Sequence, residues 1–161
     1  MAFALLALAP LAPGWAAPPQ APEEVAGQVF SLWKANKIPQ LAQYLRTKSA
    51  TAPDYAPAVV AGAMYDYIFL GKLYAAKAKL LRISAVTAAN PEVFPEVYQG
   101  YLAAALSKLN DEIRIQLAHG TTEQDWQANA NPQAVRNTIG TNGFPIMTLL
   151  LVTPKVTLPP R

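Results

Sequence analysis

Apolar side chains recur every three or four positions between residues 23 and 118, which is the spacing of one face of an α-helix rather than of a strand. The recurrence is interrupted at Asn36, at residues 49–54 and at Gly71, where turn-forming residues stand. The pattern therefore predicts four helices, over residues 23–36, 38–48, 55–71 and 72–83.

A further helical pattern, over residues 97–109, continues to a glycine cap at Gly120. Two short helices are predicted after it. The first is opened by a capping box at residues 121–124, and the second covers residues 131–140. We expect residues 121–143 to cap the end of the helical array, because an exposed terminal helix pair would leave its apolar face in water.

The first four predicted helices form two pairs that superpose with an offset of 35 residues along the sequence. A period of this size is typical of repeat proteins whose unit is a helical hairpin. The matching positions carry side chains of similar character. They are Val29 and Met64, Leu32 and Tyr67, Ile38 and Leu73, Leu41 and Ala76, and Leu45 and Leu80.

The second pair resembles a tetratricopeptide repeat, a helix-turn-helix unit of about 34 residues. The resemblance covers residues 23–109 and implies antiparallel helix pairs stacked side by side, with a concave face that binds proteins or peptides. A plain helical bundle needs the same residue sizes where its helices cross, so it stays open as an alternative. The matches are the tyrosine Tyr67, the small inter-helix residue Gly71, the close-packing alanine Ala76, the large apolar Leu80 and, for the first pair, the closing proline Pro53.

The N-terminal end has a different composition from the predicted helices. Residues 1–22 hold no charged side chain, and a short apolar run is followed by prolines and by small residues at Gly14 and Ala16. This pattern is typical of a secretory signal peptide over residues 1–16, with a proline-rich lead-in over 17–22. We expect an exported protein, in the periplasm or outside the cell, with no membrane span once the signal is removed.

The C-terminal end, residues 144–161, is apolar and rich in proline. Because proline interrupts helices, this segment is predicted to form an extended tail. Six of the seven residues from Ile146 to Val152 are apolar. Left exposed, such a segment promotes association between chains, so we expect it to dock against the helices of residues 23–143. The predicted fold is all-α, with two to three antiparallel helix pairs, a short helical cap and this tail.

Composition narrows the possible chemistry. Hydrophobic residues make up 52% of the chain and charged residues 14%, which supports a packed core. The chain has no cysteine and a single histidine, His119, so neither a metal site nor a cofactor is expected. The formal net charge of +3 is too small to predict a nucleic-acid partner.

No catalytic residues are predicted, because the sequence lacks the common nucleophile, zinc-protease, phosphate-binding and dinucleotide-binding motifs. Asp111 and Glu112 are adjacent carboxylates. Neighbours on a helix point about 100° apart, so these two do not form the facing pair that acid/base hydrolysis requires. His119, next to Gly120, fits the end of a helix.

Positive charge is concentrated between residues 72 and 82, where Lys72, Lys77, Lys79 and Arg82 stand with no acidic residue between them. Such a basic helix is suited to an acidic peptide or an anionic polymer. The alternative is that these side chains are solvated or face acidic residues of the same protein.

Aromatic residues gather around the second helix pair and the helix after it; they include Tyr65, Tyr67, Phe69, Tyr74, Tyr98 and Tyr101. We expect Tyr67 and Tyr101 to pack between helices, and Tyr65 and Tyr74 to lie at the surface, where a tyrosine brings an apolar ring and one polar group to a binding site. The favoured function is a protein-binding or peptide-binding module. The alternatives are a small cell-envelope hydrolase that uses carboxylates, and a structural envelope subunit. The resemblance to tetratricopeptide repeats implies a concave face that includes some of Gln28, Ser31, Tyr65 and Asp66. The other predicted binding residues are Tyr74, Lys72, Lys79 and Arg82.

Overall fold

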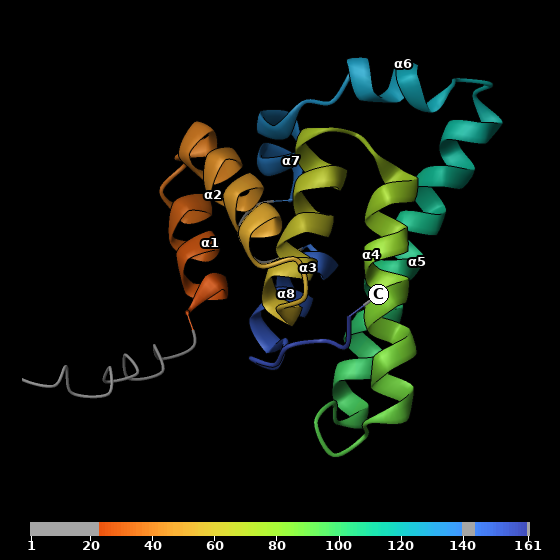
Figure 1. Cartoon of the computed structure of the whole chain (residues 1–161). Coiled ribbons are helices and arrows are strands. Elements are labelled where there is room, and N and C mark those ends of the chain that lie inside the picture. Colours follow the sequence, from red (N-terminus) through yellow and green to blue (C-terminus); the bar gives the residue numbers. More distant parts are fainter. Residues whose placement is uncertain (1–22, 140–143, 161) are drawn as a thin grey trace, which may run out of the picture.

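The computed structural model describes residues 23–139 and 144–160, and within them the chain is helical and forms no strand. The all-α prediction is therefore confirmed (Figure 1). The elements are α1 (Val25–Lys34), α2 (Ile38–Thr51), α3 (Ala56–Met64), the π-helical turn η1 (Tyr65–Phe69), α4 (Leu73–Ala89), α5 (Glu96–Ala118), α6 (Glu123–Ala128), α7 (Pro132–Ile139) and α8 (Pro145–Val152).

The predicted breaks between the first four helices are present. Asn36 and Gly71 both adopt a positive φ, 57° and 63°, which reverses the chain between α1 and α2 and between η1 and α4. The proline at position 39 stands in the first turn of α2, where its missing N–H costs no hydrogen bond. Two boundaries differ from the prediction, because α2 runs on to Thr51 and α4 runs on to Ala89.

One hydrophobic core joins these helices. Each helix from α1 to α5 packs against the next one along the chain, and α4 and α5 lie side by side in Figure 1. Ala76 is fully buried, as its predicted close-packing role requires. The largest fully buried side chains include Trp33, Leu41, Leu45, Met64, Leu73, Leu80, Ile83, Phe94, Tyr98 and Leu109.

The region after α4 does not form a third helical hairpin. Residues 96–118 are one uninterrupted helix, α5, which ends at a glycine with positive φ, Gly120. The next elements, α6 and α7, are only six and eight residues long. The described chain thus holds four helices that each pack on the next, followed by a long helix and a short cap.

The prediction of an extended tail is wrong for residues 145–152, which form the helix α8. Pro145 stands in its first turn, where proline is compatible with a helix, and the next proline is Pro154. A helix also satisfies its own backbone hydrogen bonds when it is buried. The prediction that this segment docks is confirmed, because Ile146, Met147, Leu149 and Leu150 are buried. They pack mainly against α5 and α3, with a smaller contact to α1.

Residues 153–160 are the part of the tail that is not helical. They run past the turn between α2 and α3, where Ala56 N–H donates to the Val156 carbonyl (2.8 Å) and Leu158 N–H donates to the Asp54 carbonyl (2.6 Å). Arg82 of α4 also donates to the carbonyl of Pro159, at 2.9 Å. These contacts hold the end of the described chain against α4, as Figure 1 shows.

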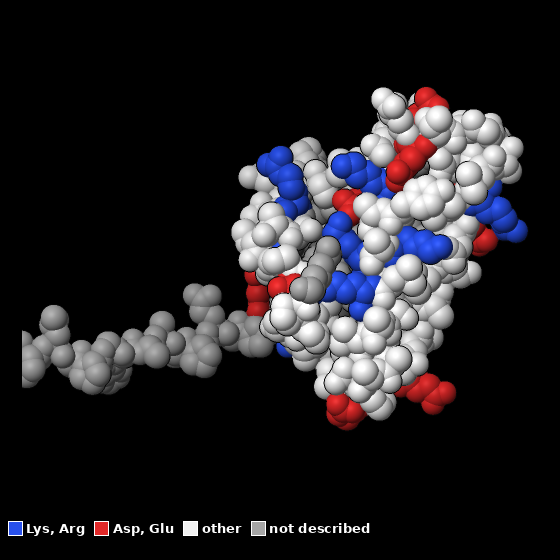
Figure 2. All heavy atoms as spheres, turned by 45° about the vertical axis from the view of Figure 1, so that its right-hand side comes forward, with Lys and Arg blue, Asp and Glu red and all other residues white. Residues whose placement is uncertain are grey.

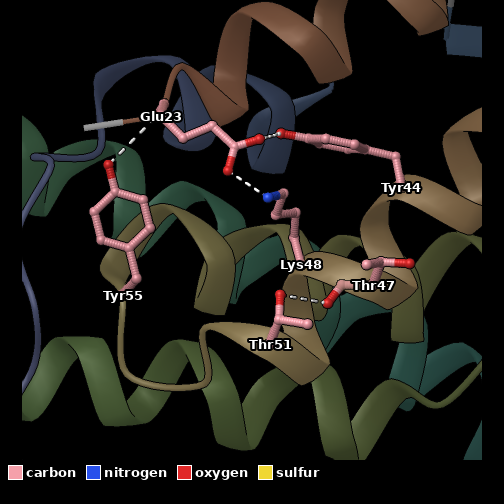
Figure 3. A network of polar contacts seen from close by, with 6 residues as sticks. All are labelled: Glu23, Tyr44, Thr47, Lys48, Thr51 and Tyr55. Atoms are coloured by element: carbon pink, nitrogen blue, oxygen red, sulfur yellow. Dashed lines mark hydrogen bonds and ion pairs between the residues drawn. The ribbon is translucent and has the colours of Figure 1, made fainter. Parts of the chain in front are cut away.

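The start of α1 is held by a polar network around Glu23 (Figure 3). Its carboxylate accepts a hydrogen bond from the Tyr44 hydroxyl at 3.0 Å and pairs with the Lys48 ammonium. The Tyr55 hydroxyl donates to the Glu23 carbonyl at 3.3 Å. The hydrogen bond from Lys48 holds the pKa of Glu23 below its ordinary value. The predicted signal peptide and lead-in precede this network and lie outside the described residues.

Candidate functional site

A pocket of about 450 Å³ opens between η1, α5, α6 and α7. Its walls are mostly apolar, and the side chains of Ile68, Trp126 and Val135 contribute to them. Polar groups come from Asn129 and Asn131, near the link between α6 and α7, and from α5. A concave, mainly apolar pocket with a few converging polar groups is the usual form of a binding site. We call it the cap pocket.

The cap pocket exists because of how the chain leaves α3. The helix widens into the π-helical turn η1, a feature that is frequent at functional sites. Gly71 then brings the chain against α6. A Cβ atom at this position would lie 3.0 Å from both the Cα of Gln127 and the carbonyl oxygen of Trp126. Gly71 therefore packs against the cap as well as ending η1.

The helix α6 is started by a capping box, one residue later than predicted. The Thr122 hydroxyl accepts from the Asp125 N–H at 3.1 Å, and the Asp125 carboxylate accepts from the Thr122 N–H at 3.1 Å. The helix α7 is tied to α1, because the Arg136 side chain donates to the Trp33 carbonyl at 3.1 Å. These contacts position the outer wall of the cap pocket.

Three polar side chains meet on the inner wall. The Tyr67 hydroxyl donates to Glu112 Oε1 at 3.4 Å, and the Lys108 ammonium lies 2.8 Å from the same oxygen. Burial raises the pKa of Tyr67, and the negative charge of Glu112 raises it further. The phenol therefore stays protonated as a donor at neutral pH. Its ring stacks on Phe144, with 5.1 Å between the centroids.

Asp111 and Glu112 do not form a facing pair beside the cap pocket. Among the described residues that line the cap pocket, Glu112 supplies the one carboxylate, so the paired carboxylates of a hydrolase are not found there. Asp111 pairs instead with Arg114, at 3.0 Å, away from Glu112 as the helix geometry requires. Among the described residues, no cluster of three or more potential metal ligands occurs. Across the same ranges, no helix is both long and apolar enough to cross a membrane.

The residues predicted to line a concave face lie in different environments. Gln28 and Ser31 are exposed on α1. Asp66 is buried in η1, where it pairs with Lys79 of α4. Tyr65 is partly buried and stacks on Phe69, with 5.7 Å between the ring centroids. Asp66 and Tyr65 thus contribute to the packing of η1.

The predicted basic residues all lie on or beside α4, and Figure 2 shows Lys and Arg side chains gathered on the face turned to the viewer. Lys72 is exposed, whereas Lys79 reaches Asp66. Arg82 donates to Asp54 at 2.5 Å and also to two backbone carbonyls. Lys79 and Arg82 therefore face acidic residues of the same protein, which was the alternative interpretation of this charge.

The exposure of the predicted tyrosines differs between positions. Tyr74 is exposed, as expected, with 44% of its surface accessible. Tyr67 is partly buried, as expected. The prediction that Tyr101 packs between helices is wrong, because Tyr101 is at the surface with 36% of its area accessible. Its neighbour Tyr98 takes the buried position on α5 and hydrogen-bonds to Thr153, which follows α8.

The sequence does not reveal the cap pocket directly. Tyr67 and Glu112 are 45 residues apart, and no local pattern predicts their contact. One signal was available, because Lys108 and Glu112 stand at i and i+4 on a predicted helix, which favours an ion pair.

No protein-family model matches the chain, and neither a curated protein nor a solved structure shows significant similarity to it. The cap pocket and the outer surface of α4 are therefore the features on which a function is proposed.

Proposed function

We propose that this chain is an exported, helical-repeat-like module that binds a protein or peptide, and that the cap pocket receives one side chain of its partner. The observation that carries the proposal is the cap pocket itself: about 450 Å³ of mainly apolar space with a polar cluster on one wall. Space of this kind accommodates a large apolar side chain and leaves polar groups for the backbone that carries it.

The residues around the cap pocket have distinct roles in this proposal. The partner's side chain lies against Ile68, Trp126 and Val135, where burial of apolar area supplies the affinity. Asn129 Nδ2 donates to the Asp125 carbonyl at 2.8 Å, and Asn131 Oδ1 accepts from the Ala134 N–H at 3.0 Å. The Oδ1 of Asn129 and the Nδ2 of Asn131 are therefore the amide groups that a peptide backbone would meet. An aromatic anchor is favoured, because aromatic side chains contribute large contact area at little entropic cost.

The test uses Trp126 as a reporter within the pocket. The full chain is titrated with end-blocked Gly/Ser hexapeptides that carry one Phe, Leu or Lys. We expect the Phe and Leu peptides to change the tryptophan emission and the Lys peptide to have a smaller effect. Trp126→Phe should remove the change, because the other described tryptophan, Trp33, is buried in the core.

A matched pair of variants locates the binding. Ala130 lines the cap pocket and Ala128 does not, so Ala130→Phe should fill the space while Ala128→Phe places the same ring on the exposed surface of α6. Peptide binding should be lost in the first variant and kept in the second. Equal binding by both variants, or no response to any of the three peptides, contradicts the assignment of the pocket.

Export rests on the uncharged, apolar start of the chain and on the small residues before the bond between Ala16 and Ala17. Intact-mass analysis of the protein from its native host tests it. A secreted chain that begins at Ala17 is expected, and an intracellular chain that keeps residues 1–16 contradicts export without affecting the assignment of the pocket.

A further inference from the structure

The outer face of α4 carries a row of exposed residues that the core does not use. Tyr74 and Leu81 are the large members, with 44% and 48% of their surface accessible. The spacing of the row alternates between four and three residues, which is the a/d pattern of a helix that pairs with another helix. The row consists of Tyr74, Ala78, Leu81, Ala85 and Ala88, all of them exposed. We call it the α4 seam.

The charges that α4 itself carries beside the seam are all positive. When the seam residues take positions a and d, Lys77 occupies a g position and Arg82 an e position, so a cation stands on each side of Leu81. α4 itself carries no acidic side chain. The carboxylates that face α4 from other elements are Asp54, Asp66 and Glu123, and they reach Arg82, Lys79 and the backbone N–H of Tyr74.

Two cations remain uncompensated by these contacts. No ion pair joins Lys72 or Lys77 to a carboxylate within residues 23–139 and 144–160. A hollow of about 390 Å³ also adjoins the seam, lined by Ala75, Ala78, Lys79 and Arg82. The two cations that line it are paired with Asp66 and Asp54, so the hollow supplies space beside the seam while Lys77, unpaired among the described residues, supplies the charge.

We propose that the α4 seam is a docking surface for an amphipathic helix of another protein, one whose apolar stripe is flanked by Glu or Asp. Charge complementarity determines this occupant. Arg82 is already paired with Asp54, so Lys77 is the cation beside the seam that no described carboxylate pairs with. A second copy of α4 would bring Lys77 against a cation, whereas an acidic residue of the partner helix would form an ion pair with it. The alanines at three seam positions let the partner helix approach closely. The proposal rests on the proposed binding role, but it uses a surface distinct from the cap pocket.

The test compares two synthetic helical peptides of the same length as α4, labelled with a fluorophore and monomeric at the concentrations used. Both carry Leu at a and d, and they differ only in having Glu or Lys at e and g. Fluorescence anisotropy with the full chain should show the Glu peptide binding at least about tenfold more tightly than the Lys peptide, with the difference shrinking as salt is added. Equal affinities overturn the proposal.

Variants of the exposed surface locate the contact. Leu81→Asp and Lys77→Glu should each weaken binding of the Glu peptide by about tenfold or more, and Lys77→Glu should improve binding of the Lys peptide. The control is Leu117→Asp on α5, which is also an exposed leucine, with 63% of its surface accessible. It should leave both affinities unchanged. Unchanged binding by Leu81→Asp overturns the proposal.

The outcomes separate this proposal from the one for the cap pocket. Loss of Glu-peptide binding in Ala130→Phe would place the helix in the pocket and overturn the seam assignment. Normal hexapeptide binding in Leu81→Asp is expected, because the two surfaces differ. Light scattering that shows a dimer, dissociated by Leu81→Asp, would assign the seam to a second copy and also overturn the proposal.

Discussion

The C-terminal helix α8 and the two short helices before it join the same fold in opposite ways. α8 is eight residues long, and four of its side chains are buried among α5, α3 and α1. α6 has no buried residue, and it rests on the body through the partly buried Trp126 and the close contact at Gly71. α8 is thus part of the core, whereas α6 and α7 form a lightly attached wall around a pocket. Binding sites are often located in such weakly stabilised regions, because those regions can adapt to a partner.

The largest expected loss of stability follows from a substitution in the core of α8. Leu149 is fully buried, so Leu149→Ala should lower the free energy of unfolding by about 2–5 kcal/mol. The matched control is Leu151→Ala on the same helix, where half of the side chain is exposed and the change should stay within about 0.5 kcal/mol. Urea denaturation followed by circular dichroism measures both. Similar midpoints for the two variants would show that α8 is not part of the core.

The second-largest expected loss of stability follows from a substitution at Gly71, where η1 meets the cap. An alanine at position 71 must adopt a positive φ, which costs about 1–2 kcal/mol, and its Cβ would also press on the backbone of α6. Gly120 has nearly the same φ, 65°, but nothing lies within 4 Å of a Cβ there. Gly71→Ala should therefore destabilise the protein more than Gly120→Ala does, and it alone should change the emission of Trp126.

A third glycine completes this comparison. Gly100 lies within α5, exposed and free of neighbours at the Cβ position, so Gly100→Ala should raise the free energy of unfolding by about 0.5–1 kcal/mol. Thermal denaturation of the three variants separates helix propensity, backbone strain and contact with the cap. If Gly71→Ala and Gly120→Ala lose the same stability and leave the Trp126 emission unchanged, α6 does not depend on the contact at Gly71.

The difference between helices with one apolar face and a helix that is apolar on every side explains which elements could be predicted from the sequence. The helices α1, α2, α4 and α5 follow the apolar spacing closely, because each one buries a single face, whereas every residue of α3 is buried and its end is marked by the turn at Gly71. α8 was missed because its residues are apolar on every side, so spacing carries no information about helix or strand. The flanking prolines and the β-branched residues suggested an extended chain, and burial by tertiary contacts decided otherwise.

The candidate site was less predictable than the fold, for a different reason. The sequence identifies which residues are basic or aromatic, but it does not identify the side chains that they contact in the folded protein. Lys79 and Arg82 are paired across the fold with Asp66 and Asp54, which lie 13 and 28 residues away. The cap pocket likewise depends on contacts between η1, α5 and α7, which no local pattern specifies.

The smallest expected effect is the pH response of α6. Hydrogen bonds from the Thr122 side chain and backbone hold the pKa of Asp125 below its ordinary value of 3.8. Because the folded state has the lower pKa, the stabilisation of α6 is fully present above the ordinary value and is lost as the pH falls through the pKa of the folded state. At that point the carboxylate is protonated and no longer serves as a charged acceptor for the Thr122 N–H, so the first turn of α6 should fray.

NMR titration of the Asp125 carboxyl carbon, together with amide exchange along the chain, measures this response. We expect acid to increase exchange in α6 while the amides of α8 stay protected, since α8 is held by buried apolar contacts that do not titrate. Thr122→Ala should return the pKa of Asp125 toward 3.8 and give the same fraying at neutral pH. An Asp125 that titrates at its ordinary value in the native chain would mean that the capping box does not hold α6. Exchange that rises equally in α6 and α8 would mean that the cap and the core unfold as one unit, which would remove the distinction between a rigid core and an adaptable wall.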